Sequence, residues 1–388
     1  MERGGNRAVT FDHCFLCQTY SYIVGAVSRP KATIGGKFSG KGLVQPEALL
    51  NRVRNQKTAE ALAKKANYGL AASTHDSYNT AINHLKRCEE ETGVSMSLPF
   101  DDRKTMEFLG WMEARGLRSR SMSTYLSGIR AYHIATGHKD PFVRDPMVKL
   151  ILKGQDNWDK LQDRLGGKLG KLPVTKNMMM LIKKNLIKTD WPKLEKRLLW
   201  AIFTMAWSGS FRIHELCSRK EKEFDTQTTL LWKDVAFGEI LVKEEHVKTI
   251  EVHIKSPKVD RVGAGDMIQV FQLGNFMCPL EAMNRYREEM KMEEDPEMPV
   301  FRKSSGMCMT GAEINRKLAI LTQEVGKLVP GGKIKSHSFR SGVPSEMARN
   351  GENAEAIQAV GRWNGESYKI YCKLPLTRRA DMARAVGK

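Results

Sequence analysis

The sequence predicts a mainly α-helical protein with a small antiparallel β-sheet, built as two domains. Three observations support this fold class. Apolar residues recur at helical spacing along most of the chain after Thr74, two short segments rich in β-branched residues interrupt the second half, and a segment rich in glycine and lysine separates the halves. A length of 388 residues is typical of two or three domains.

Residues 1–68 are the least informative part of the chain, and we expect a partly helical N-terminal arm there. The segment begins irregular and Gly-rich (GGKFSGKG) and ends in an expected helix, PEALLNRVRNQKTAEALAKKA. His13, Cys14 and Cys17 have metal-like spacing, but no second ligand pair with zinc-finger spacing follows, so a metal site there stays an open question. The seven cysteines are odd in number and mostly scattered, which favours reduced thiols over a disulfide framework.

Residues 69–164 are expected to form a compact domain of four short helices. The first helix has one apolar face, because its apolar residues recur three, four and seven positions apart. Gly116, Gly137 and Pro146 mark where the later helices stop or start. The apolar face consists of Tyr78, Ala81, Ile82, Leu85 and Cys88, and the later helices read DRKTMEFLGWMEARG, SMSTYLSGIRAYHIATG and PMVKLILKGQDNW.

Residues 165–175, LGGKLGKLPVT, are expected to form an interdomain linker, because glycines, lysines and a proline replace the hydrophobic pattern. The second domain, residues 176–388, begins with a helix for which Thr175 is the expected N-cap. TLLWKDVAF and KTIEVHIKS are the expected strands, the second because its apolar residues alternate. Thr310 and Glu313 form an expected capping box at the start of another helix.

The charge of the chain indicates a polyanionic partner. Lysines and arginines outnumber acidic residues 63 to 44, which gives a net charge of +19. Nucleic acid is the simplest partner for such an excess, because each neutralised phosphate releases counterions; a basic protein without that partner is the alternative. No apolar run reaches the roughly 18 residues of a membrane span, and the first residues do not resemble a signal peptide, so we expect no membrane association.

Two distant segments hold arginines in settings that suit a phosphate. In WSGSFRIHELC, Arg212 stands where an apolar helix ends and another begins, and Glu215 follows at a spacing that orients a guanidinium. In KSHSFRSGVPSEMARNG, His337 and Arg340 are three residues apart at a helix start, so both side chains can reach one anion. Each alone is equally consistent with a surface Arg–Glu pair or with a capping histidine beside a solvated arginine.

The order of these segments, followed by GRWNGESYKIYCK, resembles the tyrosine recombinase family, the site-specific recombinases of the phage-integrase type. WSGSFRIHEL is similar to the family's G-x-R-x-x-E-L box, HSFR to its H-x-x-R box, and GRW with the following tyrosine to its last box, where Trp363 stands at a position often held by histidine. The spacing GRW-x7-Y is most like the DIRS-type and crypton-type recombinases of eukaryotic mobile elements. The resemblance covers about residues 70–388.

The resemblance implies a helical core-binding domain over 69–164, a catalytic domain over 176–388 and a role for each site residue. Arg212 and Arg340 would bind the scissile phosphate, His337 would handle protons, and Glu215 would support them. Trp363 would pack beside the phosphate. Lys255, at the end of a strand, would be the general acid for the leaving 5′-oxygen, and Lys258 is the alternative.

Two tyrosines compete for the role of nucleophile. Tyr368 and Tyr371 are three residues apart, so helical geometry does not choose between them. The family spacing selects Tyr371, which stands eight residues after Trp363, and it assigns a packing role to Tyr368. DNA contacts of the core-binding domain are expected at the start of its third helix, where basic side chains and helix amides suit phosphate, although a solvated basic face is the alternative. These contacts are Arg118, Arg120, Ser121 and Thr124.

The resemblance therefore predicts a site-specific recombinase that cuts and rejoins double-stranded DNA through a 3′-phosphotyrosine intermediate, as a homo-tetramer on paired sites. A nicking-closing enzyme like the type IB topoisomerases and a DNA-binding protein without catalysis are the alternatives. We expect no cofactor and no metal, since neither a spaced acidic set nor a P-loop is evident. The expected location is the nucleus for a mobile-element recombinase, or otherwise the cytoplasm and nucleoid.

Overall fold

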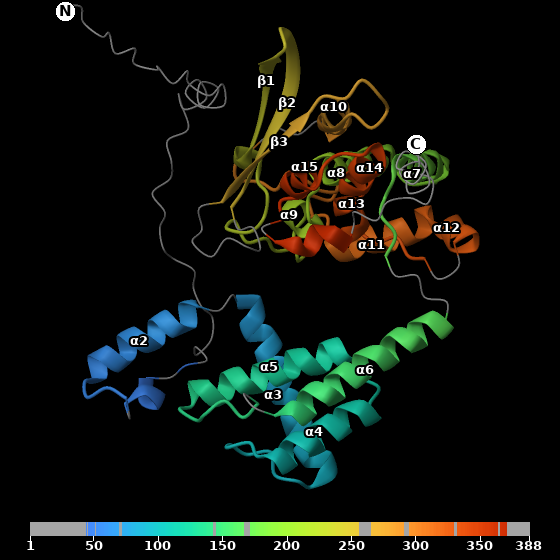
Figure 1. The fold of residues 1–388 in the computed structure, drawn as a ribbon. Helices are drawn as coiled ribbons and strands as arrows, with labels where there is room; N and C mark the ends of the chain where they lie inside the picture. The colour runs from blue at the N-terminus through green and yellow to red at the C-terminus, as the bar shows by residue number, and fades with distance from the viewer. Residues whose placement is uncertain are drawn as a thin grey trace, which may run out of the picture. The chain divides into compact units, whose positions relative to one another are not determined.

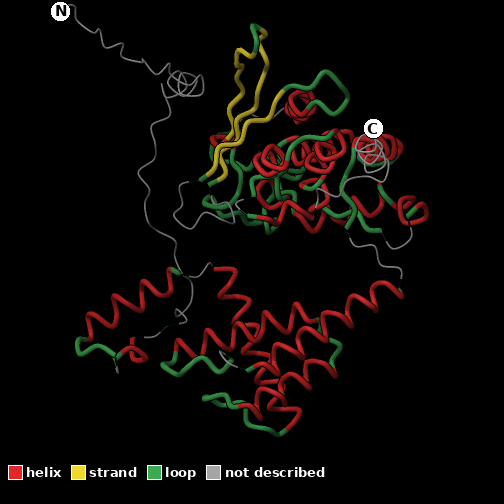
Figure 2. The backbone as a smooth tube through the Cα atoms, in the orientation of Figure 1, coloured by secondary structure: helices red, strands yellow, loops and turns green. Residues whose placement is uncertain are grey.

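A computed structural model describes residues 44, 46–50, 52–69, 72–142, 145–166, 171–255, 265–290, 295–329, 332–363 and 365–370. Their secondary structure is mainly α-helical with one three-stranded antiparallel sheet, which confirms the predicted fold class (Figure 2). Buried hydrophobic residues form two clusters, one between residues 85 and 148 and one between residues 174 and 339.

The helix expected near the end of the N-terminal arm is interrupted. A short 3₁₀ helix, η1 (Pro46–Leu49), is followed by α2 (Gln56–Tyr68). The interruption arises because Asn55 has an extended backbone and its side chain accepts the amide N–H of Lys57, which makes Asn55 an N-cap where the prediction had a helix interior. Residues 1–43, with His13, Cys14 and Cys17, lie outside the described residues.

The four expected helices of the first domain are present as α3 (Ala72–Thr92), α4 (Asp102–Ala114), α5 (Ser119–Ala135) and α6 (Pro146–Leu165) (Figure 1). The predicted stops are confirmed, because Gly116 and Gly137 both follow a helix end with φ of +67° and +88°. α6 ends at Leu165, about two turns further than predicted. The helices enclose an apolar core that includes Cys88, Phe108, Met112, Met122 and Ile129.

The segment expected to be a linker is only partly separate from the second domain. Residues 167–170 lie outside the described residues, but Leu172 donates its N–H to Lys333 at 3.0 Å and Val174 donates to Ser338 at 2.9 Å. Val174 is fully buried, so the proline–valine end of the segment belongs to the second hydrophobic core. Thr175 then caps α7 (Lys176–Lys188) as predicted, by accepting the N–H of Met178.

The sheet contains β1 (Val235–Val242), β2 (Glu245–Ile254) and β3 (Asp266–Phe271) in the order β1-β2-β3. The predicted buried face of the second strand is confirmed. Ile250 and Val252 are fully buried, and Ile254 is 4% exposed. The first was predicted too early, since the WKD of TLLWKDVAF forms a 3₁₀ turn, η2 (Trp232–Asp234), and β3 was not predicted.

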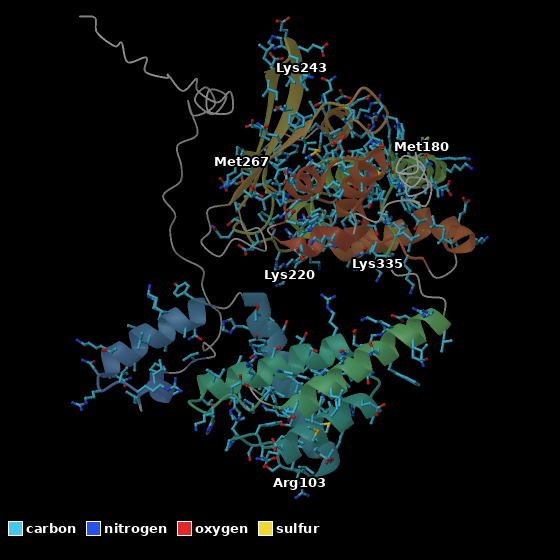
Figure 3. All side chains as sticks on the ribbon, viewed as in Figure 1. Arg103, Met180, Lys220, Lys243, Met267 and Lys335 are labelled. Atoms are coloured by element: carbon cyan, nitrogen blue, oxygen red, sulfur yellow. The ribbon has the colours of Figure 1, made fainter. Side chains whose placement is uncertain are left out.

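The β1–β2 hairpin turns at two residues with positive φ, Lys243 and Glu244, which is the conformation of a tight hairpin. Figure 3 shows Lys243 at the tip of this hairpin.

Helices pack beside the sheet around the second hydrophobic cluster (Figure 1). The central one is α8 (Lys193–Ser208), in which every residue from Leu198 to Ala206 is buried. The stacked rings of Phe203 and Phe339, 5.1 Å apart, fix α13 (His337–Arg340) on α8. The other elements are α9 (Ile213–Leu216), α10 (Pro279–Met290), α11 (Gly311–Leu321), α12 (Gln323–Leu328), α14 (Gly342–Asn350), α15 (Ala354–Val360) and η3 (Glu366–Ile370).

Thr310 caps α11 by accepting the N–H of Glu313, which confirms one half of the predicted capping box, whereas the Glu313 carboxylate accepts a hydrogen bond from Lys303. None of the helices among the described residues has the length and apolar character needed to cross a membrane.

Candidate active site

Arg212 stands at the N-terminus of α9, where the chain turns sharply after α8. Glu215, three residues later, accepts the backbone N–H of Arg212 at 2.8 Å and its guanidinium Nη1 at 2.7 Å. One carboxylate therefore fixes both the backbone and the side chain of Arg212. The Arg212 side chain remains 15% exposed, whereas that of Glu215 is 2% exposed, so the arginine has an open side and its partner does not.

Arg340, at the end of α13, is 2% exposed and its guanidinium is held by backbone oxygens. It donates to the carbonyl of Ser210 at 2.8 Å and to that of Gly361 at 2.6 Å. Its guanidinium carbon also lies 5.6 Å from the ring centre of Trp363. Arg340 thus joins the α8–α9 turn to the segment after α15, and it brings the three predicted boxes together.

Arg362 is a third arginine in this cluster, and the sequence analysis did not single it out. Its Nη2 donates to Glu215 at 2.8 Å and to the carbonyl of Ser210 at 3.3 Å, and its Nη1 lies 3.4 Å from a carboxylate oxygen of Asp266. Arg362 thereby shares Glu215 with Arg212 and the Ser210 carbonyl with Arg340. Its place beside Trp363 was readable in the sequence, but its φ of +53° and its partners were not.

Charge in this cluster is unbalanced toward the positive. Arg212 and Arg362 bind one buried carboxylate, Glu215, and Arg362 also lies near Asp266, which is 42% exposed. Arg340 adds a third positive charge, which backbone carbonyls hold in place. Burial alone would raise the pKa of Glu215, but the charge of Arg362 and the hydrogen bonds from Arg362 and Arg212 outweigh burial and hold the pKa below its usual value. The carboxylate is therefore ionised at neutral pH, and about one positive charge remains for an external anion.

His337 begins α13, one turn before Arg340, and its side chain is exposed. Loss of solvent around part of the imidazole lowers its pKa, and the charges of Lys171, Arg340, Arg212 and His214 lower it further. The interactions with both arginines place His337 at the same cluster. The imidazole is thus neutral at pH 7, with one nitrogen able to accept a proton.

Lys255 directly follows β2, and its ammonium donates to the carboxylate of Asp234 at 2.6 Å. Like Arg362, Asp234 was not predicted as a site residue. It lies in TLLWKDVAF, which was predicted as a strand. The strand register links Lys255 to the arginines: Ile254 pairs with Asp266, whose carboxylate contacts Arg362. Lys258, the alternative general acid, lies outside the described residues.

Trp363 is partly buried, and its ring fills the space beside Gly361. A Cβ at Gly361 would lie 1.8 Å from this ring, so only glycine fits there. Tyr368, in η3, lies with its ring centre 6.4 Å from that of Trp363, which agrees with the packing role expected for it. Tyr371, the expected nucleophile, lies outside the described residues.

The expected DNA contacts lie at the start of α5, as predicted, but they differ in their surroundings. Arg118 forms two hydrogen bonds with Asp163 of α6, and Asp159 accepts the first helical N–H, that of Ser119. Arg120 is exposed, and Thr124 bonds back to the carbonyl of Arg120. Ser121 is partly buried. Carboxylates of α6 therefore already engage part of this helix start, including Arg118, whereas no carboxylate partner is described for Arg120.

No group of three or more metal-ligating side chains occurs among the residues that the structure describes. His13, Cys14 and Cys17 are outside that range.

Comparisons with known proteins give matches to solved structures alone, since no protein-family model and no curated protein sequence matches the chain. The XerH site-specific recombinase, bound to palindromic difH substrate in a post-cleavage complex, is 13% identical with a TM-score of 0.54, and the match covers 88% of each chain. A lambda integrase dimer bound to a COC′ core site is 14% identical with a TM-score of 0.50, covering 84% of this chain and 75% of the other.

A second structure of lambda integrase, residues 75–356, is also 14% identical, with a TM-score of 0.51, and covers 79% of this chain and 90% of the other. At these identities the likeness establishes the fold. The chain has the fold that these site-specific recombinases and integrases share.

Proposed function

We propose that this protein is a site-specific DNA recombinase that cuts and rejoins DNA through a 3′-phosphotyrosine intermediate. The observation that carries the proposal is a cluster of three arginines with His337 beside them: Arg212 and Arg362 share the buried carboxylate of Glu215, and Arg340 shares the Ser210 carbonyl with Arg362. A phosphodiester in transfer gains charge on its non-bridging oxygens, and fixed guanidiniums stabilise that charge without a metal.

The reaction assigns one role to each residue. The phenolic oxygen of Tyr371 attacks the phosphorus, the bond from phosphorus to the 5′-oxygen breaks, and a 3′-phosphotyrosine and a free 5′-hydroxyl result. His337 accepts the phenolic proton, which its neutral state allows. Lys255 gives a proton to the leaving 5′-oxygen. Attack by the 5′-hydroxyl of a partner strand then reverses these steps and rejoins the DNA.

Two further residues hold the arginines in place. Glu215 orients Arg212 and Arg362 through one carboxylate, and Trp363 covers the guanidinium of Arg340. Two backbone carbonyls accept hydrogen bonds from the Arg340 guanidinium and hold it in place, so its charge acts on the phosphate from a fixed position.

The partner is double-stranded DNA, in keeping with the net charge of +19. The proposal includes a homo-tetramer acting on paired sites, the DIRS-type or crypton-type subfamily, and a nuclear location in a eukaryotic mobile element. The spacing between Trp363 and Tyr371 supports the subfamily. The proposed domains are an arm at 1–68, a core-binding domain at 69–164, a linker at 165–175 and a catalytic domain at 176–388.

The test traps the covalent intermediate. We would mix the full chain with a library of DNA duplexes that have a randomised central segment and a nick, so that a short strand with a 5′-hydroxyl diffuses away after cleavage. Sequencing the DNA that stays attached to denatured protein gives the target site. Peptide mass spectrometry locates the modified tyrosine, which we expect to be Tyr371.

Matched tyrosine variants decide the nucleophile. Tyr371→Phe should abolish the adduct while DNA binding survives, and Tyr368→Phe should keep it because the ring that packs on Trp363 is retained. The reverse pattern would reassign the nucleophile. DNA binding by the wild-type chain without any adduct would instead indicate a binding protein, and relaxation of supercoils without resolution of a synthetic four-way junction would indicate a topoisomerase.

A further inference from the structure

Lys255 and Asp234 form the least exposed of the lysine–carboxylate pairs near the sheet. Their side chains are 18% and 6% exposed. By contrast, the neighbouring pair of Lys233 and Glu297 has side chains that are 43% and 64% exposed. A surface pair contributes little and forms readily, whereas a pair removed from water must offset a large cost of desolvation. The burial of the Lys255–Asp234 pair therefore calls for an explanation.

Asp234 is held more firmly than the lysine it contacts. It ends the η2 turn, and its carboxylate accepts the backbone N–H of Leu231 at 2.8 Å as well as the ammonium of Lys255. Trp232, within the same turn, is 8% exposed. Lysine, by comparison, carries its charge on a flexible four-carbon stem. The carboxylate thus fixes where the ammonium lies.

The position of this pair relates it to the arginine cluster. Val235, the residue after Asp234, pairs with Val252 of β2, so Asp234 and Lys255 meet at one end of the sheet. At that same end, Ile254 pairs with Asp266, and Asp266 contacts Arg362. The fixed ammonium therefore belongs to the same end of the sheet as the proposed phosphate site.

We propose that Asp234 is a positioning residue that holds Lys255, charged and in place, as the proton donor to the leaving 5′-oxygen. This inference rests on the proposed function. As the bond between phosphorus and the 5′-oxygen breaks, one proton moves from the Lys255 ammonium to that oxygen and leaves a neutral amine and a 5′-hydroxyl. In the rejoining step the amine takes the proton back. Asp234 does not touch the DNA and keeps its hydrogen bond to Leu231 throughout.

The proposal makes the effect of Asp234 depend on the leaving group. Two suicide duplexes of the sequence recovered from the library would differ in one atom, with either oxygen or sulfur bridging the scissile phosphorus and the 5′-carbon. A thiolate leaves without a proton because a thiol is a far stronger acid than an alcohol. A residue that serves only proton donation therefore becomes dispensable on the sulfur duplex, while a residue that serves folding does not.

We expect Asp234→Asn and Lys255→Gln each to slow single-turnover cleavage of the oxygen duplex by roughly 100-fold, and to cleave the sulfur duplex within a few fold of wild type. The double variant should be no slower than Lys255→Gln alone, because the two residues act as one unit. Glu297→Gln, which removes the exposed partner of Lys233, is the matched control and should match wild type on both duplexes.

Three outcomes would overturn the inference. Equal slowing of both duplexes by Asp234→Asn would make its role structural. Rescue by sulfur for Lys258→Gln but not for Lys255→Gln would make Lys258 the donor. A rate for Asp234→Asn equal to wild type on the oxygen duplex would remove Asp234 from the reaction.

Stability and the wider proposal are checked separately. Thermal unfolding shows whether each variant folds. If Asp234→Asn does not fold, Asp234→Glu replaces it, because it keeps the negative charge but displaces it. Cleavage of the oxygen duplex by Asp234→Glu should then be slowed more than cleavage of the sulfur duplex, and equal slowing of both would contradict the inference. Absence of an adduct from the wild-type chain on both duplexes would reject the proposed recombinase function, which is a different result from any of these.

Discussion

At the scale of single residues, Arg340 shows how a proposed phosphate-binding group also holds a fold together. Its guanidinium is buried and donates to the carbonyls of Ser210 and Gly361, from two distant segments. Arg212 has an exposed side and shares its carboxylate with Arg362. The two arginines therefore contribute differently to stability, although both serve the same proposed chemistry.

Arg340→Ala should lower the free energy of unfolding by about 3 kcal/mol, because the buried Gly361 carbonyl loses its donor, the Ser210 carbonyl keeps only its longer bond from Arg362, and a cavity opens. Arg212→Ala should lower it by about 1 kcal/mol or less, since Arg362 still neutralises Glu215. Both should reduce covalent cleavage by at least about 100-fold. Urea unfolding followed by tryptophan fluorescence measures the two losses in free energy of unfolding. Equal losses for Arg340→Ala and Arg212→Ala would contradict the different structural roles of the two arginines.

Glu215 should make stability depend on pH in the acid range. Its pKa is lowered in the folded protein, so its ionisation stabilises the fold fully above the ordinary glutamate pKa of about 4.3, and this contribution is lost as pH falls toward the lowered value. Glu215→Gln should destabilise the protein by about 3 kcal/mol at pH 7 and flatten the decline below about pH 4. Unfolding curves at several pH values measure this, with Glu297→Gln as the exposed control.

His337 should set the acid side of the pH profile for cleavage. The lowered pKa keeps the imidazole neutral below its ordinary value of about 6.5. If the neutral ring accepts the tyrosine proton, cleavage at limiting DNA should hold its rate through pH 6.5 and fall only at more acid pH. His337→Gln should be slower and lack this fall. A wild-type rate that rises as the imidazole becomes protonated would reverse the assigned role.

At the scale of elements, the start of α5 shows that a basic helix end is not automatically a phosphate site. Asp159 and Asp163 of α6 engage the Ser119 N–H and the Arg118 guanidinium. These carboxylates compete with phosphate, so binding there requires Arg118 to exchange partners. Arg120 is exposed, and no carboxylate partner is among the interactions described for it, so it can bind phosphate without exchanging partners.

Arg120→Ala should reduce the salt dependence of DNA binding by about one unit in the slope of log K against log salt, because one phosphate contact is lost. Arg130→Ala, on the same helix but paired with Asp140, is the matched control and should leave the slope unchanged. Fluorescence anisotropy across a salt series provides the measurement. Equal slopes for Arg120→Ala and wild type would remove this face of α5 from the interface.

At the scale of the whole molecule, the positive charges that the proposed chemistry needs come from arginine and lysine side chains. The net charge is +19, and the proposed site gathers Arg212, Arg340, Arg362 and Lys255 with one buried carboxylate at the arginines and another at the lysine. In the proposed function, this excess of positive charge has two effects: it attracts DNA at long range, and it stabilises the transferred phosphate at short range.

Covalent cleavage should therefore proceed in the presence of EDTA at the same rate as in magnesium, because in the proposed mechanism guanidiniums and an ammonium fill the roles that metal ions fill in metal-dependent nucleases. Adduct formation on the suicide duplex measures this directly. A reaction abolished by EDTA and restored by magnesium would contradict the mechanism. Raising salt should weaken binding in both conditions alike.

The sequence by itself determined the fold class, most helices and the order of the boxes, because these depend on local patterns. Helix ends at Gly116 and Gly137, the cap at Thr175 and the alternation of β2 are properties of neighbouring residues, and the structure confirms them. Two predictions were wrong: PEALLNRVRNQKTAEALAKKA is not one continuous helix, and β1 begins later than expected. In each case one capping side chain, that of Asn55 or Asp234, redirects the backbone.

Only the tertiary structure decided which charges meet. Arg212 with Glu215 was readable from spacing, but Arg362 with Glu215 and Asp266, Arg340 with the Ser210 carbonyl, and Lys255 with Asp234 join residues that are far apart in the chain. No local pattern encodes such pairs, because they form only when the core around α8 closes and the sheet register is set. The charge and hydrogen bonds of the arginines then keep Glu215 ionised against the effect of burial, and the cluster retains the excess positive charge that the proposed chemistry uses.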